Sequence, residues 1–155
     1  MIRTVEIAVA GIRRPRWRER VGAFCELVLR EAGAREWELS LLLCNDTRMQ
    51  ELNGRYRGKD RPTDVLSFPR ETSRKAKAGL LKGAAVTGDI AISLETLRRN
   101  ANDFEISEKE ELKRLLVHGI LHCAGMDHGT GKGRRMLALQ ERLLEAVKEA
   151  RIIGT

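Results

Sequence analysis

Residues 118–128 read HGILHCAGMDH, and this stretch holds all three histidines of the 155-residue chain. His118 and His122 are four positions apart, so on an α-helix they share one face. Gly125 permits the backbone reversal that ends such a helix and lets His128 turn back toward the other two imidazoles. Three imidazoles without a nearby fourth ligand are typical of a catalytic zinc site with one open position. The stretch therefore predicts a helix, a turn and an open metal centre.

Two neighbouring residues are candidates for supporting roles at this centre. Cys123 would close the site as a fourth ligand, but it follows His122 directly and so points roughly 100° away around a helix. Asp127 would orient a ligand imidazole by accepting its other N–H, or it would be an ordinary loop carboxylate. The sequence favours the open site and leaves the role of Asp127 undecided.

The spacing HxxxHxxGxxH also occurs in the metzincin proteases, with one difference. In those enzymes the residue after the first histidine is a glutamate that serves as the general base. In this chain that residue is Gly119. The chain therefore has the ligand spacing of a zinc protease but lacks the proton acceptor that peptide hydrolysis uses.

The flanking sequence predicts an α+β fold. Ser107 and Glu110 form a capping-box pattern that starts the histidine helix, and Gly125 ends it. No repeat or linker interrupts the chain, so residues 1–155 are expected to form one domain, with one mixed four-stranded sheet flanked by helices and a zincin-like metal-binding helix. We expect strands over 3–10, 37–44, 64–68 and 88–93, a basic loop over 70–87, and further helices over 15–33, 47–58, 93–99 and 132–150.

Composition limits the cellular setting. The three cysteines, Cys25, Cys44 and Cys123, form no CxxC pair, so neither a disulfide framework nor a cysteine zinc knuckle is indicated. The first sixteen residues alternate charged and apolar side chains, unlike a signal peptide, and no segment approaches the roughly 20 apolar residues of a membrane helix. We expect a soluble, cytoplasmic protein that has no membrane partner.

The charge balance favours a polyanionic partner. Lys and Arg number 29 against 22 Asp and Glu, which gives a net charge of +7 and a pI near 9.8. The basic residues gather in three segments, 13–20, 55–61 and 70–83. Aromatic residues are only 4% of the chain, so phosphate contacts would dominate over base stacking. The alternative is a charged, solvated surface without a nucleic-acid partner.

Two further segments carry a family resemblance: YRGKDRPTDVLSFP (Tyr56–Pro69) and GDIAIS (Gly88–Ser93), followed by HGILHCAGMDH. In this order they closely resemble the bacterial YbeY-type rRNA maturation factors, a family of metal-dependent single-strand endoribonucleases. The resemblance extends over residues 37–129. It implies a zinc-type ion, although nickel or another divalent transition metal also suits three imidazoles. It further implies single-stranded ribosomal RNA as substrate, 3′ end processing of small-subunit rRNA, ribosome quality control, and the ribosome or ribosomal proteins as partners.

By motif position, the resemblance makes His118, His122 and His128 the metal ligands and Arg57 the functional arginine. We therefore assign catalytic roles to Arg57 and His118, with Arg57 also binding substrate. A guanidinium can hold two phosphate oxygens and stabilise charge that develops on them. The nucleophile is either a metal-activated hydroxide or the RNA 2′-hydroxyl, and DNA should resist cleavage in the second case.

The motifs also contain polar residues with less definite roles. Asp64 is as well suited to a structural role as to one at the cleft, whereas Ser67 is expected to be structural. Asp89 would satisfy backbone donors or support the site, without a catalytic role. Cys123 and Met126 replace an aliphatic residue and a tyrosine that are common in the family, which affects only the lining of the groove.

The sequence is compatible with two other functions. One is a zinc protease or amidase, against which Gly119 argues. The other is a ribosome assembly factor without catalytic activity whose metal ion is structural. In the second case, loss of His118 would abolish folding, whereas in an enzyme it would leave a folded, inactive protein.

Overall fold

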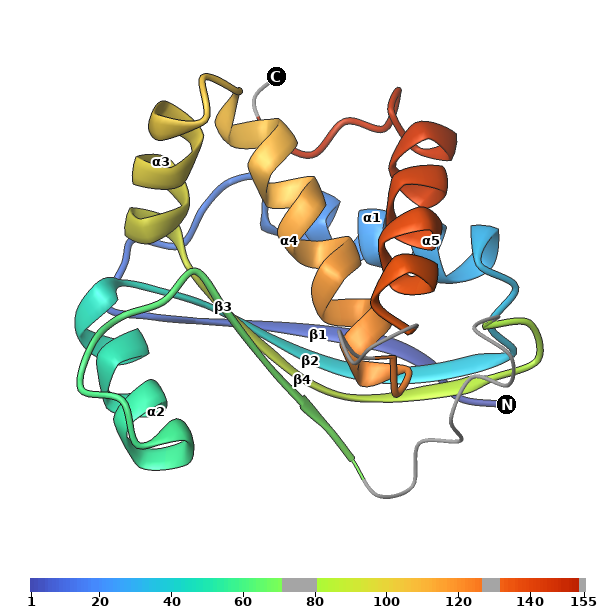
Figure 1. The fold of residues 1–155 in the computed structure, drawn as a ribbon, viewed down its shortest axis with the longest axis horizontal. Coiled ribbons are helices and arrows are strands. Elements are labelled where there is room, and N and C mark those ends of the chain that lie inside the picture. The colour runs from blue at the N-terminus through green and yellow to red at the C-terminus, as the bar shows by residue number, and fades with distance from the viewer. Residues whose placement is uncertain (71–80, 127–131, 154–155) are drawn as a thin grey trace.

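The computed structural model describes residues 1–70, 81–126 and 132–153, so the predictions for Asp127 and His128 lie outside the described residues. Within these ranges the strands and helices follow one another along the chain as Figure 1 shows. They are β1 (Arg3–Ala10), α1 (Arg18–Glu31), β2 (Glu36–Cys44), α2 (Asp46–Arg57), β3 (Val65–Pro69), β4 (Ala85–Ser93), α3 (Leu94–Asp103), α4 (Glu108–Cys123) and α5 (Lys132–Ala146).

The strands form one mixed sheet in the order β1-β2-β4-β3. β1, β2 and β4 are parallel to one another, and β3 pairs antiparallel with β4 at one edge. Pro69 ends β3 at that edge, where a residue without an N–H removes no ladder hydrogen bond. The predicted fold class, α+β with a mixed four-stranded sheet flanked by helices, is confirmed.

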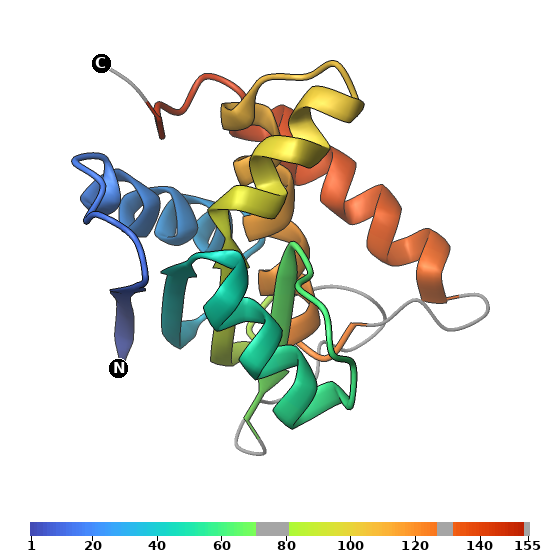
Figure 2. The same cartoon turned by 90° about the vertical axis from the view of Figure 1, so that its left-hand side faces the viewer.

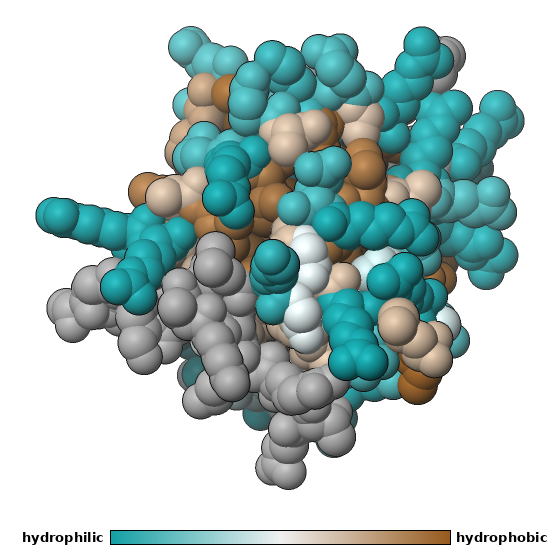
Figure 3. Space-filling model, turned by 90° about the vertical axis from the view of Figure 1, so that its right-hand side faces the viewer, coloured by the Kyte–Doolittle hydropathy of each residue, from teal (hydrophilic) through white to brown (hydrophobic). Residues whose placement is uncertain are grey.

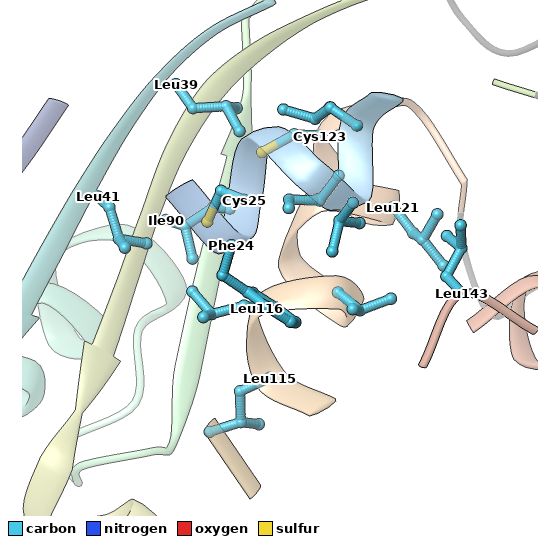
Figure 4. Packing of buried hydrophobic residues seen from close by; sticks show 14 of the residues in the cluster. Phe24, Cys25, Leu39, Leu41, Ile90, Leu115, Leu116, Leu121, Cys123 and Leu143 are labelled. Carbon is cyan, nitrogen blue, oxygen red and sulfur yellow. The ribbon is translucent and has the colours of Figure 1, made fainter. Parts of the chain in front are cut away.

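The main core lies between one face of the sheet and the helices α1, α4 and α5 (Figures 1 and 2). Alternate residues of β2 point toward these helices, among them Leu39 and Leu41, as the two-residue period of a strand requires. Figure 4 shows them with Phe24 of α1, Ile90 of β4 and Leu116 of α4. Complete burial of one such side chain contributes roughly 1.5–3 kcal/mol, so this interface holds α4 firmly in place.

A smaller core lies on the opposite face of the sheet, beneath α2. Met49 of α2 is fully buried there against Leu66 and Ala91 of the sheet. On the side that carries α5, Figure 3 shows hydrophilic side chains around a strip of apolar residues. No helix in the described part of the chain is long and apolar enough to span a membrane.

Several element boundaries differ from those predicted; α3, for example, runs to Asp103 and not only to residue 99. β4 begins at Ala85 because Ala85 and Val86 pair with Glu36 and Trp37 of β2, although their glycine-rich neighbours indicate a loop through 87. α1 begins at Arg18, not at residue 15, because residues 15–17 form a turn in which Arg18 N–H donates to the Pro15 carbonyl at 3.2 Å. α5 ends at Ala146, four residues early, and a turn follows.

Candidate metal centre and phosphate site

The helix that carries the histidines has well-defined ends. The Ser107 side chain accepts a hydrogen bond from Glu110 N–H at 3.1 Å and so caps the N-terminus, as the capping-box pattern predicts. At the C-terminus Gly125 has a positive φ of 88° and donates to the His122 carbonyl, while Met126 N–H donates to the Leu121 carbonyl. This pair of bonds is a Schellman motif, which turns the chain away after the second histidine.

The two described histidines converge on one point of the α4 surface. His118 and His122 lie one turn apart, with ring centroids at 4.6 Å and an interplanar angle of 75°. Their Nε2 atoms are 3.1 Å apart. Two nitrogens that bind one zinc ion tetrahedrally with bonds of roughly 2.0–2.1 Å would lie about 3.3–3.4 Å apart. The pair therefore fits two ligands of one metal ion.

A third side chain fixes the orientation of the first imidazole. Gln140 of α5 is buried and places its Oε1 atom 3.0 Å from Nδ1 of His118. Because a carbonyl oxygen only accepts, Nδ1 of His118 carries the proton and Nε2 presents its lone pair. Metal-binding histidines characteristically donate such a hydrogen bond from the ring nitrogen that does not bind the metal. The donor set is thus chemically suited to a divalent transition metal.

Sequence reasoning missed Gln140. The signal was present: α5 places Met136, Leu139 and Leu143 on its buried side, and Gln140 interrupts that apolar stripe. A polar residue on a buried helix face needs a hydrogen-bonding partner. Which partner it finds depends on how α5 packs against α4.

The sequence suggested three further residues for the metal centre: His128, Asp127 and Cys123. His128 and Asp127 lie outside the described residues. Within the described ranges, no group of three or more His, Cys, Asp and Glu side chains is placed to hold a metal ion. Cys123 is excluded as a ligand because its sulfur points into the core, where a Cβ added to Gly88 would lie 2.6 Å from it. Burial, reinforced by the nearby charge of Asp89, raises the pKa of the Cys123 thiol to about 12.

Gly119 has a packing role that explains why no glutamate stands there. A Cβ added at this position would lie 3.0 Å from Cγ2 of Ile90 and 3.2 Å from Oγ of Ser67. The turn between the two histidines therefore packs directly on β3 and β4. A glutamate at position 119 would point into the sheet and not toward the face that carries the imidazoles.

Arg57 reaches the same part of the sheet from the other side. It is the last residue of α2, and Gly58 ends that helix in the left-handed conformation with a φ of 68°. Nη2 of Arg57 donates to the Ser67 carbonyl at 2.9 Å, and the guanidinium carbon lies 5.0 Å from the ring centroid of Phe68. The Ser67 side chain borders Gly119, so one residue of β3 links the exposed Arg57 guanidinium to the histidine turn.

The two carboxylates considered from sequence lie elsewhere. Asp64 accepts from its neighbour Val65 N–H at 2.7 Å and from Asn100 at 3.2 Å, so it anchors the start of β3 to α3. Asp89 pairs with Arg70 at 3.3 Å. Because Gly88 faces Cys123 of α4, Asp89 points to the opposite face of the sheet, away from the histidines. Both side chains have structural partners.

Comparison with known proteins gives a consistent result. The sequence model of the family described as "Endoribonuclease YbeY" matches residues 5–148. A relative of that name from Treponema pallidum is 42% identical over 144 residues, with 92% of this chain and 89% of the relative covered. Another from Treponema denticola is 46% identical over 134 residues, with 86% and 85% covered. The Aquifex aeolicus relative is 36% identical over 135 residues, with 86% and 85% covered.

A solved structure supports the fold independently. The solution structure of TM1509 from Thermotoga maritima aligns with 98% of this chain and 97% of that chain, with a TM-score of 0.60. The two sequences are 22% identical, so this similarity concerns the fold alone.

Proposed function

Because the chain belongs to the family of endoribonuclease YbeY, we propose that it is a metal-dependent endoribonuclease that cleaves single-stranded RNA during ribosomal RNA maturation. The observation that carries this proposal is the pair of facing Nε2 atoms of His118 and His122, with His118 oriented by Gln140 and the Arg57 guanidinium anchored on the adjoining strand. The proposal includes 3′ end processing of small-subunit rRNA and ribosome quality control.

The proposed ligands are His118, His122 and His128, and the proposed ion is zinc. Nickel or another divalent transition metal suits the same imidazoles, and availability decides between them. When bound, such an ion supplies a Lewis acid for a phosphoryl oxygen or lowers the pKa of a bound water. The Gln140 bond holds the His118 ring so that its Nε2 atom faces that of His122.

Arg57 is proposed to bind the phosphate that undergoes reaction. One of its five N–H donors is engaged by the Ser67 carbonyl, which leaves the others for phosphate oxygens. The guanidinium stays charged throughout, so it can stabilise negative charge that builds up during cleavage. Its contact with the Phe68 ring limits the rotamers of this exposed side chain and so orients it before RNA binds.

Cleavage of RNA and DNA strands of the same sequence shows whether the nucleophile is the 2′-hydroxyl or hydroxide. If the 2′-hydroxyl attacks, the RNA is cut and the DNA stays intact. If hydroxide attacks, the absence of the 2′-hydroxyl does not by itself prevent cleavage of DNA. Gly119 supplies no carboxylate base in either case.

The decisive experiment combines metal analysis with cleavage assays on three variants. We expect Arg57→Ala to retain its metal and to lose roughly 10²–10³-fold in kcat, the effect of removing one stabilising donor. Arg48→Ala is the matched control, because Arg48 lies on the same helix, is exposed and pairs with Glu51. We expect His118→Ala to lose both metal and activity. Intact RNA after incubation with the metal-loaded wild type, while a control nuclease cuts, would refute the proposal.

The same variants test the two alternative functions. A protease or amidase would cleave members of a broad peptide library. An assembly factor with a structural ion would require the metal to fold, so its His118→Ala variant would lose helical circular dichroism. We expect that variant to stay folded, because apolar residues such as Leu116 and Ile120 anchor α4 in the core.

Partners and location complete the proposal. The net charge of +7 favours association with ribosomal RNA, and we propose that the ribosome or a ribosomal protein presents the substrate. We place the protein in the cytoplasm. Its three cysteines are buried free thiols, as is usual for proteins of a reducing compartment.

A further inference from the structure

A second basic site lies at the edge of the sheet where the parallel strands end. A hollow of about 610 Å³ opens there between the loop that follows β1 and the first turns of α2 and α3. Figure 2 looks onto this edge and shows the loop between β1 and α1. Four arginines and one glutamate line the hollow, and we call these arginines, Arg13, Arg14, Arg16 and Arg98, the loop cluster.

Three members of the loop cluster have no anionic partner among the described residues. Arg13, Arg14 and Arg16 are exposed and form no ion pair or hydrogen bond in that part of the chain. Other arginines of the described chain do have carboxylate partners: Arg99 binds Asp46, and Arg114 binds Glu111. Three like charges within four residues repel one another, so a bound polyanion would relieve this repulsion.

The backbone beneath the cluster is held in a fixed conformation. Gly11 has a φ of 72°, and its carbonyl accepts a hydrogen bond from Nδ2 of Asn45 at 3.0 Å. At the other end, Arg18 N–H donates to the carbonyl of Pro15, whose ring restricts the backbone. A preordered loop loses less conformational entropy when it binds a ligand.

The N-termini of α2 and α3 at this edge are capped by the chain's own side chains, Asn45 and Ser93. Asn45 caps α2 with its own side chain, and Glu95 accepts from Asp46 N–H at 2.9 Å. Recognition of an anion therefore depends on the arginine side chains. Trp17 is half-buried and lines the hollow beside Ile12 and Pro15, so an aromatic and apolar wall stands next to the guanidinium groups.

We infer that the loop cluster and Trp17 form a second binding site for single-stranded RNA, separate from the metal centre, which holds a flanking segment of a long substrate. Guanidinium groups suit phosphates, and an aromatic face beside them suits an unpaired base. A hollow fits a flexible strand better than it fits the flat surface of a bilayer. The inference rests on the proposed function, since it takes RNA as the ligand, but none of its residues belongs to the catalytic site.

The test compares two variants that each lose three positive charges. Arg13→Ala/Arg14→Ala/Arg16→Ala removes three members of the cluster. Arg35→Ala/Arg142→Ala/Arg151→Ala removes three exposed arginines from other parts of the surface. Binding to labelled single-stranded RNAs of about four and about twenty-four nucleotides is measured by fluorescence anisotropy over a range of salt concentrations.

We expect the cluster variant to bind the long RNA about tenfold or more weakly, and the slope of log Kd against log salt to fall by about 2 for three lost phosphate contacts. The control variant should change much less, and both variants should cut the short RNA like the wild type. Trp17 emission should be quenched by the long RNA, and the quenching should disappear in Trp17→Phe, because the other tryptophan, Trp37, is buried.

Equal weakening in the two triple variants would overturn the inference, since only overall charge would then matter. Displacement of the long RNA by polyglutamate as readily as by unlabelled RNA would also overturn it, in favour of an acidic protein partner. A wild type that binds the long RNA through the cluster but cuts neither RNA would refute the proposed function and leave this inference intact.

Discussion

Single residues determine whether the imidazoles are ready to bind a metal ion. His118 and His122 bring their Nε2 atoms to 3.1 Å only because one helical turn separates them and the His118 ring is held from behind by Gln140. Gly119, between them, lets that turn lie directly on Ile90 and Ser67. Each of these contacts gives a prediction that does not depend on RNA cleavage.

Gln140→Leu should weaken zinc binding by about 10–100-fold, because the His118 Nδ1–H loses its acceptor and the ring its orientation. Competition with a chromophoric chelator measures this affinity directly. Gln140→Glu is the matched variant, since a carboxylate still accepts the proton, and it should restore most of the affinity. Unchanged zinc affinity in Gln140→Leu would show that Gln140 does not position the ligand.

Gly119→Ala should lower the free energy of unfolding by up to about 2 kcal/mol, because the added methyl group overpacks the contact with Ile90 and Ser67 at a cost of about 1–3 kcal/mol, of which the helix propensity of alanine offsets about 1 kcal/mol. Gly54→Ala is the control: a Cβ added there in α2 would lie an ordinary 3.7 Å from the Lys59 carbonyl oxygen. That variant should be neutral or up to about 1 kcal/mol more stable, since alanine favours helix. Urea unfolding of both variants measures these effects. Equal shifts of the two unfolding midpoints would contradict the packing argument.

At the scale of elements, caps and junctions position the site. Asp46, at the first position of α2, accepts hydrogen bonds from Ser93, Thr96 and Arg99, each at 2.6 Å, and so joins α2 to α3. Burial by itself would raise the pKa of Asp46, but these three bonds and the charge of Arg99 outweigh it and lower the pKa. The junction fixes the start of the helix that ends in Arg57.

Asp46→Ala should therefore destabilise the protein in a pH-dependent way. A carboxyl whose folded pKa is depressed contributes stability that is fully present above its unfolded pKa, near 3.8, and is lost as the pH falls through the folded value. The difference in unfolding free energy between wild type and Asp46→Ala should be constant from pH 7 to about 5 and shrink below about 4. Denaturant titrations of both proteins across this pH range measure the difference. A difference that does not change with pH would show that the negative charge of Asp46 is not responsible.

At the scale of the whole molecule, an extensive apolar core packs α4 against the rest of the fold. α4 lies between the sheet and α5, with Leu112, Leu116 and Ile120 fully buried. The two proposed ligands His118 and His122 project from an element that the core already fixes. The protein should accordingly behave as a folded scaffold that binds metal.

Removal of the metal with a chelator should leave the far-ultraviolet circular dichroism unchanged and lower the Tm only modestly. Binding to the native state alone adds about 2.7 kcal/mol at a free metal concentration one hundred times Kd, and this is the part that the chelator removes. Thermal unfolding with and without zinc measures the effect, with His118→Ala as the variant that should no longer respond. Loss of helical signal on chelation would instead support a structural ion.

Local signals predicted much of the architecture correctly. The Ser107 cap, the Gly125 turn and the strand over 37–44 are each encoded within a few residues, and each appears in the structure. The start of β4 was not predicted, because Ala85 and Val86 become a strand only by pairing with β2. The family resemblance was confirmed, whereas the metal-binding roles of His118, His122 and His128 and the catalytic role of Arg57 stay predictions.

The sequence by itself determined the spacing of His118 and His122, the glycine that ends their helix, and the excess of positive charge, because these depend on order along the chain. Only the tertiary structure decided that Gln140 orients His118, that Ser67 connects Arg57 to the histidine turn, and that Arg13, Arg14 and Arg16 border a hollow beside α3. Those contacts join residues from separate elements, and their geometry follows from how side chains of the core pack, which no local pattern encodes.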